Sequence, residues 1–270
     1  MDILERAREL LEKEKIEYVS SLALSDCPVV RPYLLERAGI DPNGDGSVII
    51  FAVPYYISDN VDRNVSLYAV PKDYHLYFKG FFDRVLGDLR VEFPSTVFAG
   101  FSDHSPIDEM FSASLAGLGV IGKNGLLITE KYSSFVFLGE IICDAELPSN
   151  KSDILSCEDC GLCKNACPVG LDKSKCISSL TQKKGNLDEK EVKELLGGAS
   201  VWGCDICQSV CPHTKNINET DIEFFKRDRL PHLTLDKILK MTDSDFSERA
   251  YSWRGKDTIL RNLRIFEDKK

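Results

Sequence analysis

The sequence lacks a long uninterrupted hydrophobic run. Its most apolar stretch, residues 49–56, is short and contains Pro54, whereas a membrane-spanning helix needs about 18 or more apolar residues. No basic segment followed by an apolar one begins the chain, as a secretory signal would. We therefore expect a cytoplasmic protein with no membrane partner.

An excess of positive charge is also missing. Lys and Arg number 34 against 43 Asp and Glu, which gives a net charge of −9. Nucleic-acid binding draws most of its affinity from Lys and Arg that neutralise phosphates. The balance therefore argues against a broad nucleic-acid-binding surface and leaves room only for a local basic patch.

The 270 residues, 43% of them hydrophobic, suffice for one sizeable core and a smaller unit. Apolar periodicity and turn signals predict helices at 1–18, 29–38, 72–90 and just after Ser105-Pro106, and strands at 47–53, 96–101 and 134–143. The predicted fold class is α+β, with a mixed α/β domain at 1–148, a ferredoxin-like domain at 149–218 and a short helical tail at 219–270.

Two cysteine runs dominate the second half of the chain. The first has the spacing C-x2-C-x2-C-x3-C-P of bacterial ferredoxins, in which three thiolates hold one [4Fe–4S] cluster and the fourth reaches another. The second has the spacing C-x2-C-x3-C-P, and one more cysteine stands between the runs. The eight predicted ligands are Cys157, Cys160, Cys163, Cys167, Cys176, Cys204, Cys207 and Cys211.

The spacing predicts two clusters with crossed ligands. Zinc is the alternative, but zinc sites seldom use a C-x2-C-x2-C-x3-C-P run. Cys27 and Cys143 lie outside the runs and are predicted to be buried, inert thiols. We expect one cluster on Cys157, Cys160, Cys163 and Cys211, and the other on Cys167, Cys176, Cys204 and Cys207.

Further motifs accompany the cysteines between about residues 66 and 262. They are Tyr68-Ala69 with Lys72-Asp73-Tyr74-His75, Asp103, Ala116-Gly117-Leu118-Gly119 with Gly122-Lys123-Asn124, Leu138-Gly139-Glu140-Ile141, Trp202-Gly203-Cys204, and Ser252-Trp253-Arg254 with Arg261-Asn262. Together they resemble the epoxyqueuosine reductases, cobalamin-dependent iron–sulfur enzymes that complete queuosine in tRNA. An unrelated ferredoxin would share only the cysteines.

The resemblance implies a cobalamin that receives electrons from a flavodoxin or ferredoxin through the two clusters. Asp103 matches the family's proton donor, a role that requires a dry pocket or a nearby negative charge to keep the carboxyl protonated. The sequence has no D-x-H-x-x-G motif, so cobalt would lack a lower histidine ligand. The cobalamin contacts implied by the resemblance are Lys123, Asn124, Ser178, Gln182 and Lys184.

The chain departs from the family in two places. Ala69-Val70-Pro71-Lys72 replaces a glycine and arginines, and the C-terminal HEAT-type repeats that help to grip tRNA do not follow Arg261-Asn262. We therefore expect a short member of this family. The resemblance itself implies queuosine-type tRNA as the partner. Two alternatives stay open, a dehalogenase-like cobalamin reductase and an electron carrier without catalysis. In the carrier Asp103 would be only a helix-capping charge.

Overall fold

The computed structural model describes residues 2–58 and 62–268. The chain forms two compact units, Met1–Pro54 with Tyr77–Asp159 and Tyr55–Leu76 with Cys160–Lys270. Both helices and strands are present, as the predicted fold class requires. Division of the chain at residues 148 and 218 stays a prediction, since the units are defined by contacts and each combines two separate stretches.

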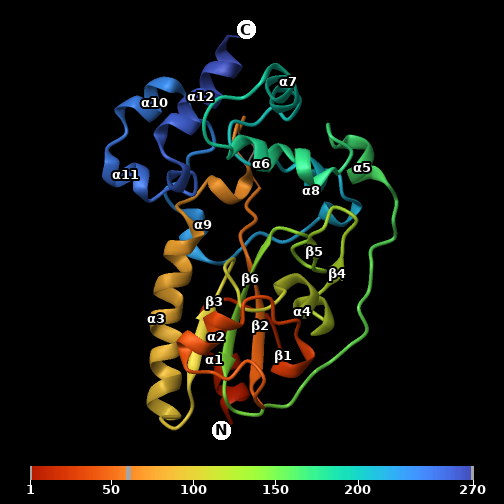
Figure 1. Ribbon diagram of the computed structural model, residues 1–270, viewed down its shortest axis with the longest axis vertical. Coiled ribbons are helices and arrows are strands. Elements are labelled where there is room, and N and C mark those ends of the chain that lie inside the picture. The colour runs from red at the N-terminus through yellow and green to blue at the C-terminus, as the bar shows by residue number, and fades with distance from the viewer. Residues whose placement is uncertain (1, 59–61, 269–270) are drawn as a thin grey trace. The chain divides into compact units, whose positions relative to one another are not determined.

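A four-stranded antiparallel sheet forms the centre of the first unit (Figure 1). Its strand order is β1-β2-β6-β3, and every residue of β2 is buried. The strands predicted at 47–53, 96–101 and 134–143 correspond to β2, β3 and β6. The strands are β1 (Tyr18–Ala23), β2 (Ser47–Pro54), β3 (Phe98–Phe101) and β6 (Val136–Cys143), and β4 (Val120–Ile121) pairs separately with β5 (Leu127–Ile128).

Helices cover both faces of this sheet. On one face, Phe81 of α3 (Tyr74–Glu92) packs on Phe51 of β2, with ring centroids 5.3 Å apart. α1 (Ile3–Lys13) lies beside α3, where Arg6 pairs with Glu92 at 2.7 Å. The other face carries α2 (Pro32–Ala38) and α4 (Glu109–Leu115), which share a core with Val48, Ile50 and Ile142. Consecutive residues of the central strands thus face different helices.

The second unit is mostly helical around a core that includes Trp202 and Tyr251, both fully buried. The buried Asn262 side chain donates to the carbonyls of Thr181 and Val201, which ties the C-terminal helix to the cysteine-bearing segment. The helices are α5 (Leu162–Ala166), α6 (Ile177–Thr181), α7 (Glu189–Gly197), α8 (Ile206–Ser209), α9 (Glu223–Lys226), α10 (Leu235–Lys240), α11 (Asp243–Ser247) and α12 (Lys256–Glu267).

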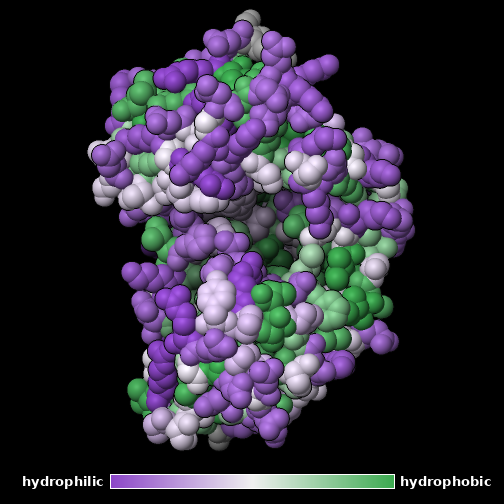
Figure 2. All heavy atoms as spheres, viewed as in Figure 1, coloured by the Kyte–Doolittle hydropathy of each residue, from purple (hydrophilic) through white to green (hydrophobic). Residues whose placement is uncertain are grey.

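Short 3-10 turns join several of these elements, at Leu24–Asp26, Leu67–Ala69, Lys173–Lys175, Pro212–Thr214 and Ser252–Arg254. Hydrophilic side chains cover much of the face in Figure 2, and hydrophobic ones gather over the β4–β5 hairpin. In the segment that pairs with β4, Leu155 is 58% exposed. Across the described residues, every helix is too short or too polar to cross a membrane.

Replacing Gly139 by alanine should lower the unfolding free energy by about 1–3 kcal/mol. A Cβ at this position of β6 would lie 2.7 Å from ring atoms of both Phe51 and Phe78, so the core would have to shift. Gly87→Ala in α3 is the control, since its Cβ would meet nothing within 4 Å and alanine favours helix. Urea unfolding measures both, and equal stability of the two variants would contradict this packing.

Candidate active site and cluster ligands

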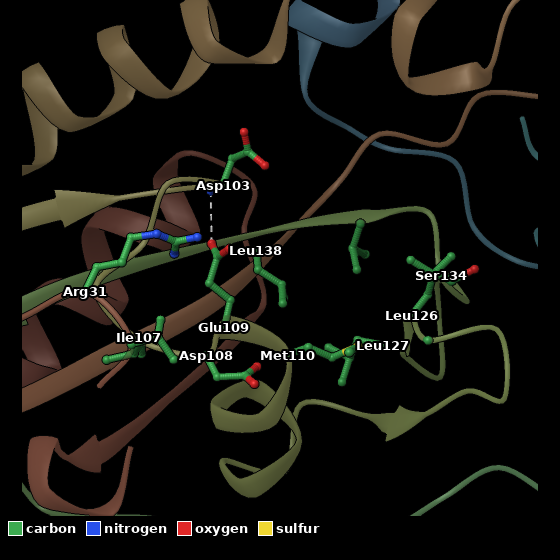
Figure 3. A pocket seen from close by; sticks show the side chains of 13 residues that line it. Arg31, Asp103, Ile107, Asp108, Glu109, Met110, Leu126, Leu127, Ser134 and Leu138 are labelled. Atoms are coloured by element: carbon green, nitrogen blue, oxygen red, sulfur yellow. Dashed lines mark hydrogen bonds between the residues drawn. The ribbon is translucent and has the colours of Figure 1, made fainter. Parts of the chain in front are cut away.

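The first unit contains a cavity of about 510 Å³, a size usual for ligand sites. Its walls are apolar, and a few polar side chains stand among them (Figure 3). The cavity lies among the loop after β3, the start of α4 and the segment from β5 to β6. Its lining includes Arg31, Asp103, Glu109, Leu126, Leu127, Ser134 and Leu138.

Asp103 lies in the loop that follows β3. Its backbone is left-handed, with φ of 63°, a conformation that aspartate tolerates better than most side chains. The Asp103 N–H donates to Glu109 Oε1 at 3.0 Å. In Figure 3 the Asp103 carboxylate points away from Glu109. The hydrogen bond to Glu109 therefore holds the backbone of the loop, while the Asp103 carboxylate is directed away from Glu109.

The short helix predicted to open at Ser105-Pro106 is present as α4, but it begins later, at Glu109. Asp108 is its N-cap and accepts from the Phe111 N–H at 3.1 Å. Glu109 is the next residue and extends along the cavity wall between Arg31 and Asp103 (Figure 3). The two acids in this first turn therefore differ in role, because only Asp108 caps the helix.

A second carboxyl lies beneath Glu109. Glu140 belongs to β6, pairs across the sheet with Ile50 and Phe101, and is 0% exposed. Neither of its carboxyl oxygens has a hydrogen-bond partner among the described side chains when both acids are ionised. The Ser105 hydroxyl lowers the pKa of Glu140 in part, without reaching hydrogen-bond geometry. A proton between Glu109 and Glu140 would satisfy this otherwise unpaired group.

Burial controls the ionisation of both acids. Desolvation, followed by the charge of Glu109, raises the pKa of Glu140 well above its ordinary value. Desolvation also raises the pKa of Glu109 to about 7, and the charge of Asp103 adds to the rise. Because Glu109 opens onto the cavity, the effect is smaller there. The pair therefore retains a proton at neutral pH, since two buried like charges cannot both ionise.

Sequence reasoning missed both members of this pair. Glu109 is ordinary as a first-turn charge, and only its position beside Asp103 in the fold distinguishes it. Glu140 did leave a signal, because it is a lone charge within the apolar strand Val136–Cys143. Charged side chains are rarely buried unless they are paired, so such a position indicates a special environment.

The predicted cluster ligands lie on short helices and in the loops around them. α5 and α8, which carry Cys163 and Cys207, pack against each other in the second unit. Their contact places the two cysteine runs side by side, as crossed sharing of ligands requires. Cys157 belongs to the first unit, just before the boundary at Asp159.

Cys204 lies near two of its predicted partners. Burial is the first cause that raises the pKa of its thiol, and the charges that raise it further include those of Cys176 and Cys167. The described residues contain no group of three His, Cys, Asp or Glu side chains that could hold a single metal ion. A [4Fe–4S] cluster gives each thiolate its own iron and so spaces its ligands more widely. Ligation by all eight cysteines stays a prediction.

Lys123 and Asn124 lie in the turn between β4 and β5. The Lys123 N–H donates to Cys157 Sγ at 3.3 Å, and its Nζ pairs with Asp159 at 2.8 Å. Asn124 Oδ1 accepts from the Leu126 N–H at 3.3 Å. These contacts tie the turn to the first cysteine of the ferredoxin run.

The other three predicted cobalamin contacts belong to the second unit. Ser178 lies on α6, Gln182 ends it, and Gln182 Nε2 donates to Ser178 Oγ at 3.4 Å. Lys184 follows in an exposed loop. The five residues are thus divided between two units, and their meeting at one cofactor stays a prediction.

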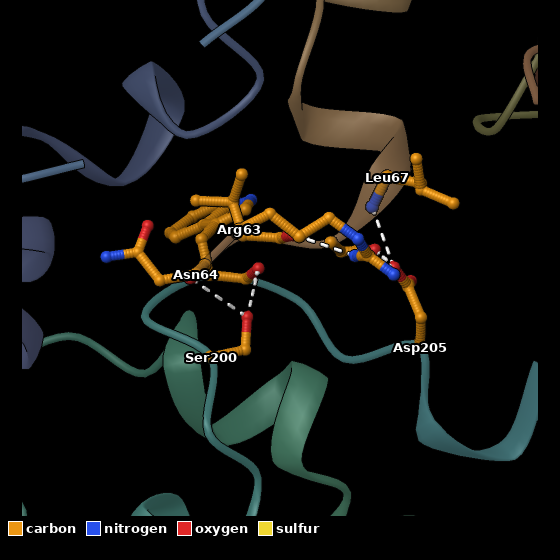
Figure 4. Close-up of polar contacts among 8 residues, drawn as sticks. Arg63, Asn64, Leu67, Ser200 and Asp205 are labelled. Carbon is orange, nitrogen blue, oxygen red and sulfur yellow. Dashed lines mark hydrogen bonds and ion pairs between the residues drawn. The ribbon is translucent and has the colours of Figure 1, made fainter. Parts of the chain in front are cut away.

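Asp205, next to Cys204, anchors the segment 63–67 in the second unit (Figure 4). Its buried carboxylate accepts from Arg63 Nη1, from the Ser66 hydroxyl and from the Leu67 N–H, the last at 2.8 Å. Three donors satisfy this acid, which distinguishes it from Glu140. The arrangement holds the backbone beside the second cysteine run.

Residues 156–214 match the protein family described as a 4Fe-4S double cluster binding domain. Over 249 residues the chain is 35% identical to an epoxyqueuosine reductase of Cyclobacterium marinum, covering 83% of this chain and 77% of that protein. It is 34% identical over 209 residues to the enzyme of Bacillus cereus, covering 71% of this chain and 53% of the relative.

A crystal structure of epoxyqueuosine reductase with an epoxyqueuosine-modified tRNA-Tyr stem loop has the same fold. Its TM-score is 0.77 at 24% identity, with 98% of this chain and 81% of that chain covered. The chain spans about half the length of several of the curated relatives it matches, among them the Bacillus cereus enzyme at 53%.

Asp205→Ala should strongly destabilise the second unit and lower its iron content. The change leaves the buried Leu67 N–H without its acceptor and removes the carboxylate partner of Arg63, whose Nη1 keeps only the Val65 carbonyl. Breaking a buried ion pair costs about 3–5 kcal/mol. Asp221→Ala is the control, because Asp221 is exposed in the same unit. Iron analysis after anaerobic reconstitution, with thermal unfolding, measures the effect. Full retention of iron would contradict the anchoring role.

Glu140→Gln should raise the unfolding free energy at pH 8, because the amide cannot ionise, whereas burial holds the carboxyl protonated well above its ordinary pKa. The raised pKa values mean that the folded chain binds more protons than the unfolded one above about pH 4.5, so stability falls as pH rises through about 7. At pH 5 the gain should shrink. Urea unfolding at both pH values, with the exposed Glu36→Gln as control, decides this. A pH-independent effect would exclude ionisation as its source.

Proposed function

Since the chain belongs to the epoxyqueuosine reductase family, we propose that it reduces epoxyqueuosine to queuosine in tRNA, in the cytoplasm. The observation that carries the proposal is Asp103 at the rim of an apolar cavity, with an ionisable acid bonded to its backbone. An acid so placed can donate a proton to an oxygen that leaves carbon when an epoxide opens.

Asp103 is the proposed proton donor. For this role its carboxyl must hold a proton near neutral pH, which a neighbouring negative charge favours. The charge of Asp103 is one cause of the raised pKa of Glu109, so the two acids interact electrostatically. Glu109 also fixes the Asp103 loop, because it accepts the Asp103 N–H at 3.0 Å.

We propose cobalamin as the cofactor, held in part by this cavity. When bound, cobalamin supplies a strongly reduced cobalt centre that reacts with the epoxide. The apolar wall of Leu126, Leu127 and Leu138 suits the flat face of a corrin ring, and the Ser134 hydroxyl offers a polar contact for its amides. Gly125, at φ of 79°, keeps the adjoining backbone free of side chains.

Electrons reach this centre through the double-cluster domain, in our proposal from a flavodoxin or ferredoxin. Four thiolates are needed for each cluster, and the eight predicted cysteines supply them. The backbone N–H of Lys123 donates to Cys157 Sγ. Hydrogen bonds to ligand sulfur help to set cluster potentials.

The tRNA anticodon region is the proposed substrate. Trp253 is 57% exposed, and the Arg254 guanidinium lies 3.7 Å from the centre of its ring. Exposed aromatic and guanidinium planes stack on unpaired bases, which suits recognition of a loop. The crystal structure with a modified stem loop supports this substrate for the relative that it contains.

Asp103→Asn should reduce turnover of epoxyqueuosine-containing tRNA by at least about 100-fold, the usual contribution of a general acid. Iron and cobalt contents should match wild type, because an amide has nearly the same shape. Asp88→Asn on the exposed side of α3 serves as control. The assay uses chain reconstituted anaerobically with iron, sulfide and cobalamin.

The reconstitution also separates the rival functions. About eight irons and one cobalt per chain, with turnover, support the proposal. Eight irons without cobalt would instead identify an electron carrier. Normal turnover by Asp103→Asn would remove Asp103 from the chemistry.

A further inference from the structure

Glu109 contacts the Asp103 loop at the residue with left-handed backbone, Asp103 itself. The accepted N–H belongs to the residue at φ of 63°, so the bond fixes the direction in which that residue presents its side chain. A carboxylate forms a stronger hydrogen bond here than a neutral acid. The ionisation of Glu109 therefore bears on the loop conformation.

The Glu140 side chain does not stabilise the fold. It occupies a position on a central strand that an apolar residue would fill at lower cost, since burying an acid without donors is unfavourable. Its neighbours Ile50 and Ile142 belong to the apolar core on the same face. Costly ionisable groups of this kind concentrate at functional sites.

We propose that Glu109 and Glu140 form a proton-sharing pair that positions Asp103 for proton donation. Glu140 carries the shared proton and donates it toward Glu109, which lets Glu109 stay ionised at the cavity wall. Glu109 accepts the Asp103 N–H and so fixes the direction in which that residue presents its carboxyl. This inference rests on the proposed role of Asp103, and Glu109 and Glu140 act only through that residue.

The surroundings leave the pair's charge largely uncompensated. Arg31 is the cation that faces Glu109, but its Nη1 is engaged by the Ser105 carbonyl at 2.8 Å and lowers the pKa of Glu109 only in part. Cys27 lies near Glu140 as a buried thiol with a raised pKa. His104 contacts the Tyr33 hydroxyl at 3.0 Å instead. The remaining titratable groups that face Glu109 are Asp103 and Glu140.

Two variants separate charge from shape. Glu109→Gln keeps an acceptor oxygen for the Asp103 N–H and removes the charge, whereas Glu109→Ala removes both. Glu130→Gln, exposed in the same unit, is the control. All are prepared as full-length chains with reconstituted clusters.

Amide hydrogen exchange of the loop 102–105 is the readout that needs no turnover. Glu109→Ala should speed exchange there by about tenfold, the loss of one good hydrogen bond, while Glu109→Gln should change it less. Infrared difference spectra should show a protonated-carboxyl band at pH 8 that Glu140→Gln abolishes. Unchanged exchange in Glu109→Ala, or a carboxyl band that survives in Glu140→Gln, would contradict the proposed proton-sharing pair.

The pH profile of kcat tests the link to Asp103. The Glu109 carboxylate accepts the Asp103 N–H more strongly than the neutral acid does. Part of the pH dependence of kcat should therefore follow the ionisation of Glu109 near pH 7, and Glu109→Gln should remove that part with little change in KM. A profile identical to wild type would overturn the positioning role. If wild-type chain itself does not turn over the tRNA, the proposed function fails, while exchange and infrared spectra still decide whether the pair exists.

Discussion

The burial of Glu140 on the central strand sets the conditions for the cavity beside it. A carboxyl with no hydrogen-bond partner among the described side chains cannot hold a charge in the core, so in our proposal it keeps a proton and donates it toward Glu109. Glu109 can then be ionised at the wall of an otherwise apolar space. The ionisation of Glu109, one of the polar residues that line the cavity, thus depends on this buried group.

Sheet geometry determines which side chains meet. In β6, Gly139 faces the aromatic side chains of α3, whereas Glu140 faces α4. Because neighbouring residues of a strand point to opposite faces, a one-residue slip of β6 would exchange these two environments. In the observed register with β2, Phe51 lies opposite Gly139, and the missing side chain of this glycine leaves room for the aromatic rings. A one-residue shift would place a side chain in that space. Aromatic packing at Gly139 on one face of the sheet thus determines that Glu140 lies on the other face.

Local patterns predicted much of the fold and little of the active-site geometry. Apolar runs and capping signals gave β2, β6 and α4, and cysteine spacing gave the double-cluster domain, since each depends on residues close in sequence. The link between Glu109 and Glu140 spans 31 positions and depends on how α4 lies on the sheet. The left-handed backbone of Asp103 is likewise bonded to Glu109, six residues along the chain. Such features emerge only from tertiary contacts.

The turn between β4 and β5 contributes both to the cavity and to the surroundings of Cys157, within the first unit. On one side Gly125 and Leu126 line the cavity, and on the other the Lys123 N–H donates to Cys157 Sγ. A change of charge on that sulfur alters the strength of its hydrogen bond and so acts on the backbone of the turn. The same turn therefore supplies part of the cavity wall and the hydrogen bond to Cys157, a predicted cluster ligand, so it links that sulfur to the proposed cofactor surface.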